Sequence, residues 1–162
     1  MARGDYNRRM AARFTCPSLV RVWSRWRGAL TLGVRGIVLT EDGCVFLVRH
    51  GYVPGWHFPG GGVERGETFA QTLARELAEE GNITLTGAPA LHGLFYHPRY
   101  SNRDHVAAYV VRDFRQSEPP KPNHEIAETG FFPLGRLPEG TTGATRARLA
   151  EVIDGAPPSP RW

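Results

Sequence analysis

The pattern of apolar and polar positions along the chain predicts a mixed α+β domain. Two β-branched, apolar runs at 32–39 and 44–48 flank Thr40-Glu41-Asp42-Gly43, and this Asp-Gly turn is typical of a β-hairpin. Similar runs predict a short strand at 56–58 and longer strands at 91–96, 106–114 and 126–134. Helical spacing appears between these runs, so strands and helices are interleaved along the chain.

The best-marked predicted helix follows the run Gly60-Gly61-Gly62. Thr68 and Gln71 have the spacing of a capping box at its start, and Asn82 is expected to end it in the left-handed conformation. The residues expected to face the core are Ala70, Leu73 and Leu77. A second helix is predicted over 142–153, before a Pro-rich C-terminal tail at 156–162.

Positive charge is concentrated at the N-terminus. Residues 1–28 contain seven arginines and one aspartate, whereas the whole chain carries a formal net charge of only +4. The remainder is therefore slightly acidic, which argues against a stable nucleic-acid complex. We predict a mobile basic tail over 1–14 and a basic amphipathic helix over 15–30, on which Leu19, Val22, Trp23 and Trp26 share one face.

Three interpretations of the predicted 15–30 helix remain open. It could pack on its own domain or on a second copy in a homodimer, associate with a membrane surface, or belong to an Arg-rich targeting peptide. The sequence has no apolar run of membrane-spanning length and no secretory signal pattern. Its two cysteines, Cys16 and Cys44, form no disulfide or zinc-binding pattern, and we expect a cytoplasmic protein.

Acidic side chains are crowded together in and before the first predicted helix. They are Glu64, Glu67, Glu76, Glu79 and Glu80. At about 100° per residue, the last three project within one arc of about 100°, so like charges are forced together. Hard carboxylate oxygens in such a cluster suit Mg²⁺ or Mn²⁺, and the preceding glycines let the backbone approach a phosphate or a metal ion.

These residues resemble the Nudix box, the signature G-x5-E-x7-R-E-U-x-E-E-x-G-U of the Nudix hydrolase family, in which U is a bulky aliphatic residue. Eight of its nine specified positions agree in register over 61–83. The matching residues are Gly61, Glu67, Arg75, Glu76, Leu77, Glu79, Glu80 and Ile83. Asn82 replaces the usual glycine, and we expect an ordinary helix end there because asparagine tolerates the left-handed conformation well.

The resemblance implies an α/β/α sandwich with a mixed sheet between helices, here a Nudix hydrolase domain over 31–155. It implies a metal-dependent pyrophosphohydrolase that cleaves a nucleoside diphosphate linked to another moiety X by water attack on phosphorus. The cofactor would be Mg²⁺, with Mn²⁺ as a substitute. The implied metal ligands are the carboxylates of Glu76, Glu79 and Glu80 and the carbonyl of Gly60, with Arg75 and Glu67 orienting them.

The resemblance leaves the general base open, because the family places it on the box helix or on a later loop. We favour Glu125, which follows the stiff Pro-rich segment 115–124, over Glu128, with Glu76 as the alternative on the helix. The candidate substrate-binding residues are Arg49, Gly61, Gly62, Arg99 and Arg103. The competing hypothesis is a catalytically weak nucleotide-sensing module. The complete set of box carboxylates favours the enzyme.

Overall fold

The computed structural model describes residues 30–98 and 103–162. Its elements, in chain order, are β1 (Thr31–Val38), β2 (Cys44–His50), β3 (Trp56–His57), α2 (Phe69–Gly81), β4 (Ile83–Leu85), β5 (Ala90–Tyr96), β6 (Asp104–Val111), β7 (Phe114–Gln116), β8 (Ile126–Pro133) and α3 (Gly143–Asp154). The predicted tail 1–14, all but the last residue of the predicted helix 15–30, and Arg99 lie outside the described residues.

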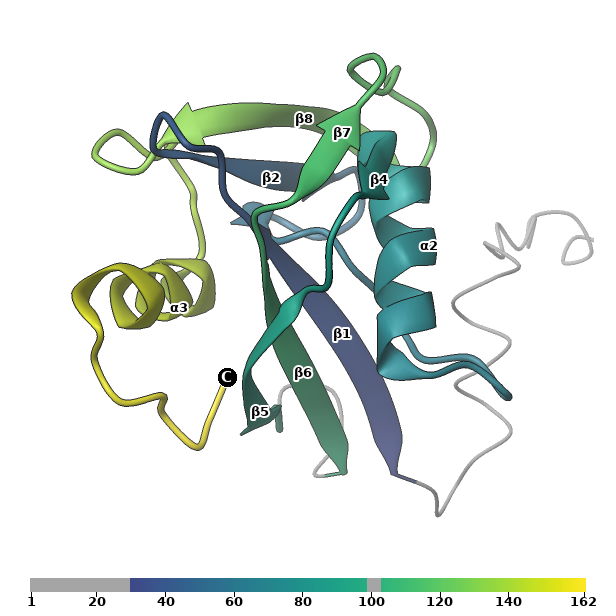
Figure 1. Ribbon diagram of the computed structural model, residues 1–162, viewed down its shortest axis with the longest axis vertical. Coiled ribbons are helices and arrows are strands. Elements are labelled where there is room, and N and C mark those ends of the chain that lie inside the picture. The colour runs from purple at the N-terminus through teal and green to yellow at the C-terminus, as the bar shows by residue number, and fades with distance from the viewer. Residues whose placement is uncertain (1–29, 99–102) are drawn as a thin grey trace, which may run out of the picture.

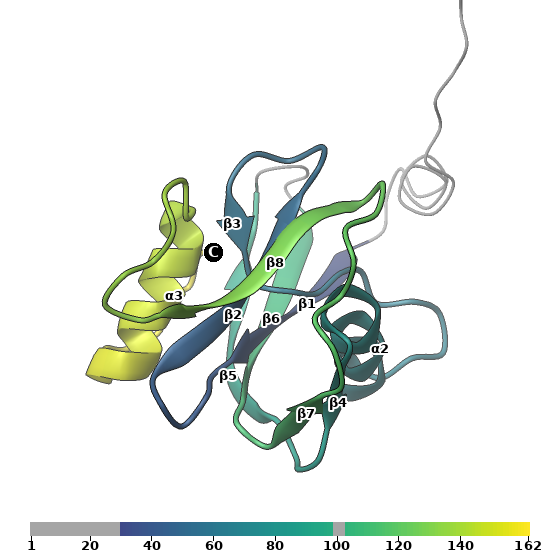
Figure 2. The ribbon, with the colours of Figure 1, turned by 90° about the horizontal axis from the view of Figure 1, so that it is seen from above.

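The two helices lie on opposite sides of the strands, as the predicted sandwich requires. One sheet has the order β1-β6-β5, in which β1 and β6 are parallel and β5 and β6 are antiparallel. A second, antiparallel sheet has the order β3-β2-β8, and β4 pairs with β7. Figure 1 shows α2 on one side of these sheets and α3 on the other, and the view from above in Figure 2 gives the same arrangement.

The predicted hairpin between the first two strands is wrong. The turn itself forms, because the Thr40 N–H donates to the carbonyl of Cys44 at 3.0 Å. However, β1 and β2 share only the isolated bridge Leu39–Val45, and each strand continues into a different sheet. Pairing along its whole length with β6 gives β1 a full hydrogen-bonded ladder, which outweighs the local preference of the turn.

The predicted strand at 106–114 is divided in two. Strand β6 ends at Val111, and β7 begins at Phe114 in order to pair with β4. Between them the Asp113 carbonyl accepts the N–H of Thr86, outside either ladder. The exposed, charged Arg112 and Asp113 mark this corner, where the chain leaves one sheet for the other.

Helix α2 has the predicted caps. The Thr68 side chain accepts from the Gln71 N–H, the Gln71 side chain accepts from the Thr68 N–H, and Asn82 adopts the left-handed conformation with φ 50°. Leu73 and Leu77 are fully buried as expected. Ala70 is exposed, contrary to the prediction, because it lies in the first turn, before the part of the helix that contacts β1.

A close approach fixes α2 on β1. A Cβ on Gly36 of β1 would lie 3.1 Å from side-chain carbons of both Leu73 and Leu77. These leucines belong to the core cluster on the α2 side, whereas Leu149 of α3 belongs to the cluster on the other side. The next turn of α2 therefore faces the loop that runs beside β1. No helix among the residues described is long and apolar enough to cross a membrane.

Candidate active site

The loop before α2 is tied along the edge of β1. The Gly36 N–H donates to the Pro59 carbonyl and the Val34 N–H to the Gly61 carbonyl, both at 2.9 Å. Gly60 has φ 136°, and a Cβ there would lie 2.2 Å from the Val34 carbonyl oxygen. Only glycine fits this position, so the backbone of Gly60 and Gly61 is pressed between β1 and α2.

Two box carboxylates rest against that backbone. The Gly60 N–H donates to Oε2 of Glu80 at 2.7 Å. A Cβ on Gly61 would lie 2.4 Å from Oε1 of Glu76, so the absence of a side chain makes room for this carboxylate. Glu76 and Glu80 are one helical turn apart, and the structure brings both to the same short stretch of backbone, whereas Glu79, predicted to share their arc, is 60% exposed.

Arg75 donates hydrogen bonds to two of the box carboxylates, Glu67 and Glu76. Its Nε and Nη2 donate to the two carboxylate oxygens of Glu67 at 2.9 and 3.0 Å, and its Nη1 donates to Oε1 of Glu76 at 2.7 Å. The Thr72 hydroxyl also donates to Glu67 at 2.7 Å. The hydrogen bonds from Arg75 and Thr72 lower the pKa of Glu67 to about 2. Glu67 is thus ionised at neutral pH and fixes Arg75, which in turn orients Glu76.

The positive charge near Glu76 and Glu80, the two carboxylates beside Gly60 and Gly61, does not offset the cost of their burial. Burial raises the pKa of Glu80 to about 8, and it also raises the pKa of Glu76. Glu79 differs, because its side chain is 60% exposed and only approaches Arg75, with Oε2 3.6 Å from Nη1. Hard oxygen donors whose ionised form is disfavoured by burial suit a divalent cation, which would supply the missing charge.

The carboxylates do not yet form a complete ligand set. Within 30–98 and 103–162, no three His, Cys, Asp or Glu side chains are grouped closely enough to hold a metal ion as they stand. Glu76 is hydrogen-bonded to Arg75, and most of the Glu79 side chain is exposed. The donor chemistry fits a metal ion, and Glu79 is free to reorient because most of its side chain is exposed.

Two residues that the sequence analysis did not single out lie at this site. The Arg35 guanidinium, from β1, donates through Nη1 to the Gly60 carbonyl and also lies 3.5 Å from the Phe58 carbonyl. His50, at the end of β2, has Nε2 3.8 Å from Oε1 of Glu80. Burial lowers the pKa of His50 to about 4, so its imidazole is neutral at pH 7. The sequence feature that could have identified Arg35 as a site residue is its position as the single arginine of an otherwise apolar strand.

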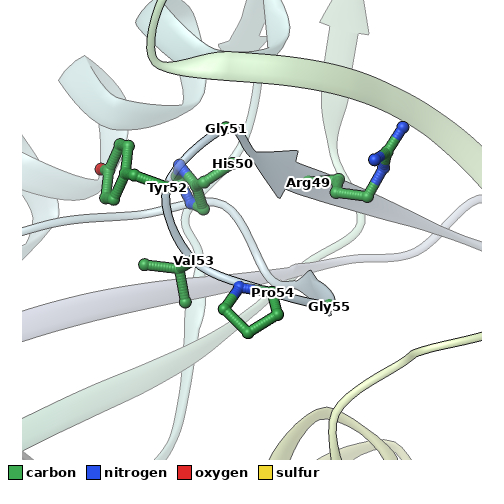
Figure 3. Close-up of a pocket in the computed structure, with 7 residues that line it drawn as sticks. All are labelled: Arg49, His50, Gly51, Tyr52, Val53, Pro54 and Gly55. Carbon is green, nitrogen blue, oxygen red and sulfur yellow. The ribbon is translucent and has the colours of Figure 1, made fainter.

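A cavity of about 440 Å³ opens beside His50, in the loop between β2 and β3. Figure 3 shows its lining, which comprises Arg49, His50, Gly51, Tyr52, Val53, Pro54 and Gly55. Arg49 reaches Glu128 with Nη2 2.5 Å from Oε2, and its guanidinium carbon lies 5.7 Å from the ring centre of Trp56. Both partners of this ion pair are about half exposed, so solvent screens it.

The two candidate loop carboxylates differ in position. The Glu125 carbonyl accepts the Gly51 N–H at 3.0 Å, and the charge of Glu125 acts on His50, which itself contacts Glu80. Glu128 lies farther along β8, paired with Arg49. Of the two, Glu125 is therefore the one connected to Glu80 through His50.

The remaining candidate substrate-binding residues are at the margin of the site. Gly62 bridges Gly33 of β1, and a Cβ on Gly62 would meet no atom within 4 Å. The carbonyl of Arg103 accepts the N–H of Thr31 at the start of β1, four residues before Arg35. At the rise of an extended strand, Thr31, which binds the Arg103 carbonyl, lies about 13 Å from Arg35 along β1. The structure thus brings Gly61 to Glu76 and Gly62 to Arg75. Arg49 instead pairs with Glu128, and Arg103 lies at the start of β1.

Comparisons with known proteins found a matching family model and similar sequences and structures. A family model described as the NUDIX domain matches residues 29–153. A curated relative from Mycobacterium tuberculosis, "Putative mutator protein MutT4", is 36% identical over 102 residues, which cover 61% of this chain and 41% of the relative. A second from Bacillus subtilis, "Putative 8-oxo-dGTP diphosphatase", is 33% identical over 76 residues, covering 47% of this chain and 50% of the relative. The chain thus spans half or less of the length of these two relatives.

A solved structure, that of the MutT NUDIX hydrolase from Burkholderia pseudomallei, superposes with a TM-score of 0.67 at 27% identity. The match covers 76% of this chain and 98% of that one. A MutT structure from Bacillus halodurans gives a TM-score of 0.65 at 22% identity and supports the fold.

Proposed function

Because this chain belongs to the NUDIX domain family, we propose that it is a metal-dependent pyrophosphohydrolase acting on a nucleoside diphosphate linked to another moiety X. The observation that carries the proposal is the placement of Glu76 and Glu80 on the backbone of Gly60 and Gly61, with Arg75 clamped beside them. A buried carboxylate, Glu80, and a partly buried one, Glu76, both with raised pKa values, are costly to a fold, and a cation bound by the working enzyme would explain them.

The residues that would hold the cation are Glu76, Glu79, Glu80 and the carbonyl of Gly60. Mg²⁺ is the proposed ion, with Mn²⁺ as a substitute, because the donors are all oxygen. When bound, such an ion neutralises charge on the diphosphate and lowers the pKa of a water molecule.

The chain's own residues would bind and orient the substrate. The open backbone of Gly61 and Gly62 allows phosphate oxygens to approach closely. Arg49, exposed at the cavity beside His50, would exchange its screened pairing with Glu128 for a bidentate contact to a phosphate. Glu67 would keep Arg75 in place through the reaction, so that Glu76 holds its orientation.

Glu125 is the proposed general base. A water molecule attacks one phosphorus, its proton passes to the Glu125 carboxylate, and the anhydride P–O bond breaks with its electron pair on the departing phosphate group. Neutral His50, which lies 3.8 Å from Glu80 and is influenced by the charge of Glu125, adds no positive charge that would hinder this proton transfer.

The name of the Bacillus subtilis relative directs attention to nucleoside triphosphates, in which X is simply phosphate. That relative is only 33% identical over 76 residues, so a substrate panel, and not its name, is used to identify the nucleobase and X. The alternative sensing module is disfavoured, because every box carboxylate is present and Glu67 and Arg75 are mutually bonded.

A substrate panel tests the proposal. Purified protein is incubated with nucleoside triphosphates including 8-oxo-dGTP, ADP-ribose, nucleotide sugars, dinucleoside polyphosphates and capped RNA, in Mg²⁺ and in Mn²⁺. Glu79→Gln is the matched control for contaminating phosphatases, because Glu79 is exposed and its replacement should leave the fold unchanged. The proposal predicts a nucleotide product from at least one class, lost in the variant. Turnover of none of them, or equal turnover by both proteins, would contradict it.

A further inference from the structure

One positively charged side chain at the candidate active site, Arg35, is not part of the Nudix box. Arg35 lies on β1 between the buried Val34 and Gly36, yet its guanidinium is directed to the glycine loop, where it donates to the Gly60 carbonyl. The N–H of the same glycine donates to Glu80. Gly60 is therefore held by a cation on its carbonyl and by a carboxylate on its amide.

Gly60 links Arg35 to the nearest carboxylate, because its carbonyl accepts from the guanidinium and its N–H donates to Oε2 of Glu80 at 2.7 Å. The positive charge of Arg35 also favours the ionised forms of Glu80 and Glu76. A guanidinium stays ionised at all physiological pH values, so this compensation is permanent.

The same groups are those through which the proposed function binds its metal ion. The Gly60 carbonyl and the Glu76 and Glu80 carboxylates are the shared partners. A divalent cation placed among them would meet a fixed positive charge, and like charges in a partly buried site repel strongly. This inference rests on the metal site of the proposed function.

We propose that Arg35 is a built-in counter-cation: it positions Gly60 and compensates Glu76 and Glu80 while no metal ion is bound, and it competes with a divalent cation for the Gly60 carbonyl oxygen. The site is thereby folded before metal arrives, and its metal affinity is set lower than the carboxylates alone would give.

The test compares Arg35→Gln, which removes the charge, with Arg35→Lys, which keeps it, in the full chain. Arg112→Gln removes one exposed positive charge outside the site and is the matched control. Two quantities are measured at pH 7.5: the thermal unfolding midpoint in EDTA and in saturating Mn²⁺, and the Mn²⁺ dissociation constant by calorimetry. Neither measurement requires turnover.

Arg35→Gln should unfold at a lower midpoint than wild type in EDTA. Adding Mn²⁺ should raise its midpoint by more than it raises that of wild type, and the variant should bind Mn²⁺ at least about tenfold more tightly. Arg35→Lys should keep near-wild-type affinity, and Arg112→Gln should match wild type in both measurements. If Arg35→Gln does not fold in EDTA, Mn²⁺ should restore its folding.

Three results would overturn the inference: weaker Mn²⁺ binding by Arg35→Gln, an equal loss of stability with and without Mn²⁺ at unchanged affinity, or failure of Mn²⁺ to restore folding. Failure of the proposed function is seen separately. It would appear as wild-type protein that binds no metal ion, or that binds one and hydrolyses nothing. In the second case the dissociation constants still decide the role of Arg35.

Discussion

Replacing Glu80 with glutamine should stabilise the metal-free protein while abolishing hydrolysis. The folded-state pKa of Glu80 is raised to about 8 from 4.5. The stability linked to its protonation is therefore complete below about pH 4.5 and is lost as pH rises through about 8. At pH 7.5 this loss amounts to as much as about 4 kcal/mol, at 1.36 kcal/mol per pH unit.

The neutral amide of Glu80→Gln avoids this loss and keeps an oxygen that can accept the Gly60 N–H. We expect a gain of about 1 to 4 kcal/mol, since relaxation around a buried charge reduces the full value, and hence a midpoint some 3–10 °C higher in EDTA. Turnover in Mg²⁺ should fall about a hundredfold or more, as expected when a direct metal contact is removed.

Glu79→Gln provides the matched control, because it makes the same chemical change on a side chain that is 60% exposed. It should lose turnover to a similar degree, yet its unfolding free energy should stay within about 0.5 kcal/mol of wild type. Thermal unfolding in EDTA and turnover in Mg²⁺ are measured on both variants. A Glu80→Gln variant that is less stable than wild type, or that keeps more than about a tenth of the wild-type rate, would contradict this prediction.

Four further predictions concern the pH dependence of stability, the general base, the end of α2 and the N-terminal segment. In EDTA, the wild-type unfolding midpoint should fall between pH 5 and pH 8.5, because unfolded Glu80 is already ionised there whereas folded Glu80 keeps its proton up to about pH 8; Glu80→Gln should show a smaller fall in the same scan. Steady-state kinetics of Glu125→Gln should show kcat lowered about 10²–10⁴-fold with little change in KM, and Glu128→Gln should do much less; a reversed ranking moves the base to Glu128. Asn82→Ala should cost about 1 kcal/mol by chemical denaturation, whereas Asn82→Gly should be close to neutral. Deleting residues 1–28 should leave kcat nearly unchanged, and a loss of turnover in a stable truncated protein would assign that segment to the active site.

The features that the sequence predicted correctly depend on residues close together in the chain. The capping box of Thr68 and Gln71 and the left-handed Asn82 are local interactions that arise from a few consecutive side chains. The clamp of Arg75 on Glu67 spans only eight positions and is contained in the box. Motif register could therefore locate the helix, its ends and its carboxylate face.

The features that it missed depend on distant pairings. The Asp-Gly turn after Thr40 indicated a hairpin, but the ladder between β1 and β6 joins residues about 70 positions apart and determines where β1 goes. Arg35 became part of the site only because that ladder and the glycine loop lie on either side of β1. Likewise, no sequence spacing connects His50 with Glu80, although their side chains lie 3.8 Å apart.

The central claim is that these carboxylates form a working metal-dependent pyrophosphohydrolase site. It is tested most directly by following a nucleoside triphosphate with ³¹P NMR in EDTA-treated wild-type protein while Mg²⁺ is added. We expect no cleavage in EDTA. As Mg²⁺ is titrated, the protein should cleave an anhydride bond to give a nucleotide and a phosphate product, at a rate that saturates. Cleavage at the same rate in EDTA, or no cleavage of any nucleoside diphosphate derivative at saturating Mg²⁺ or Mn²⁺, would contradict it.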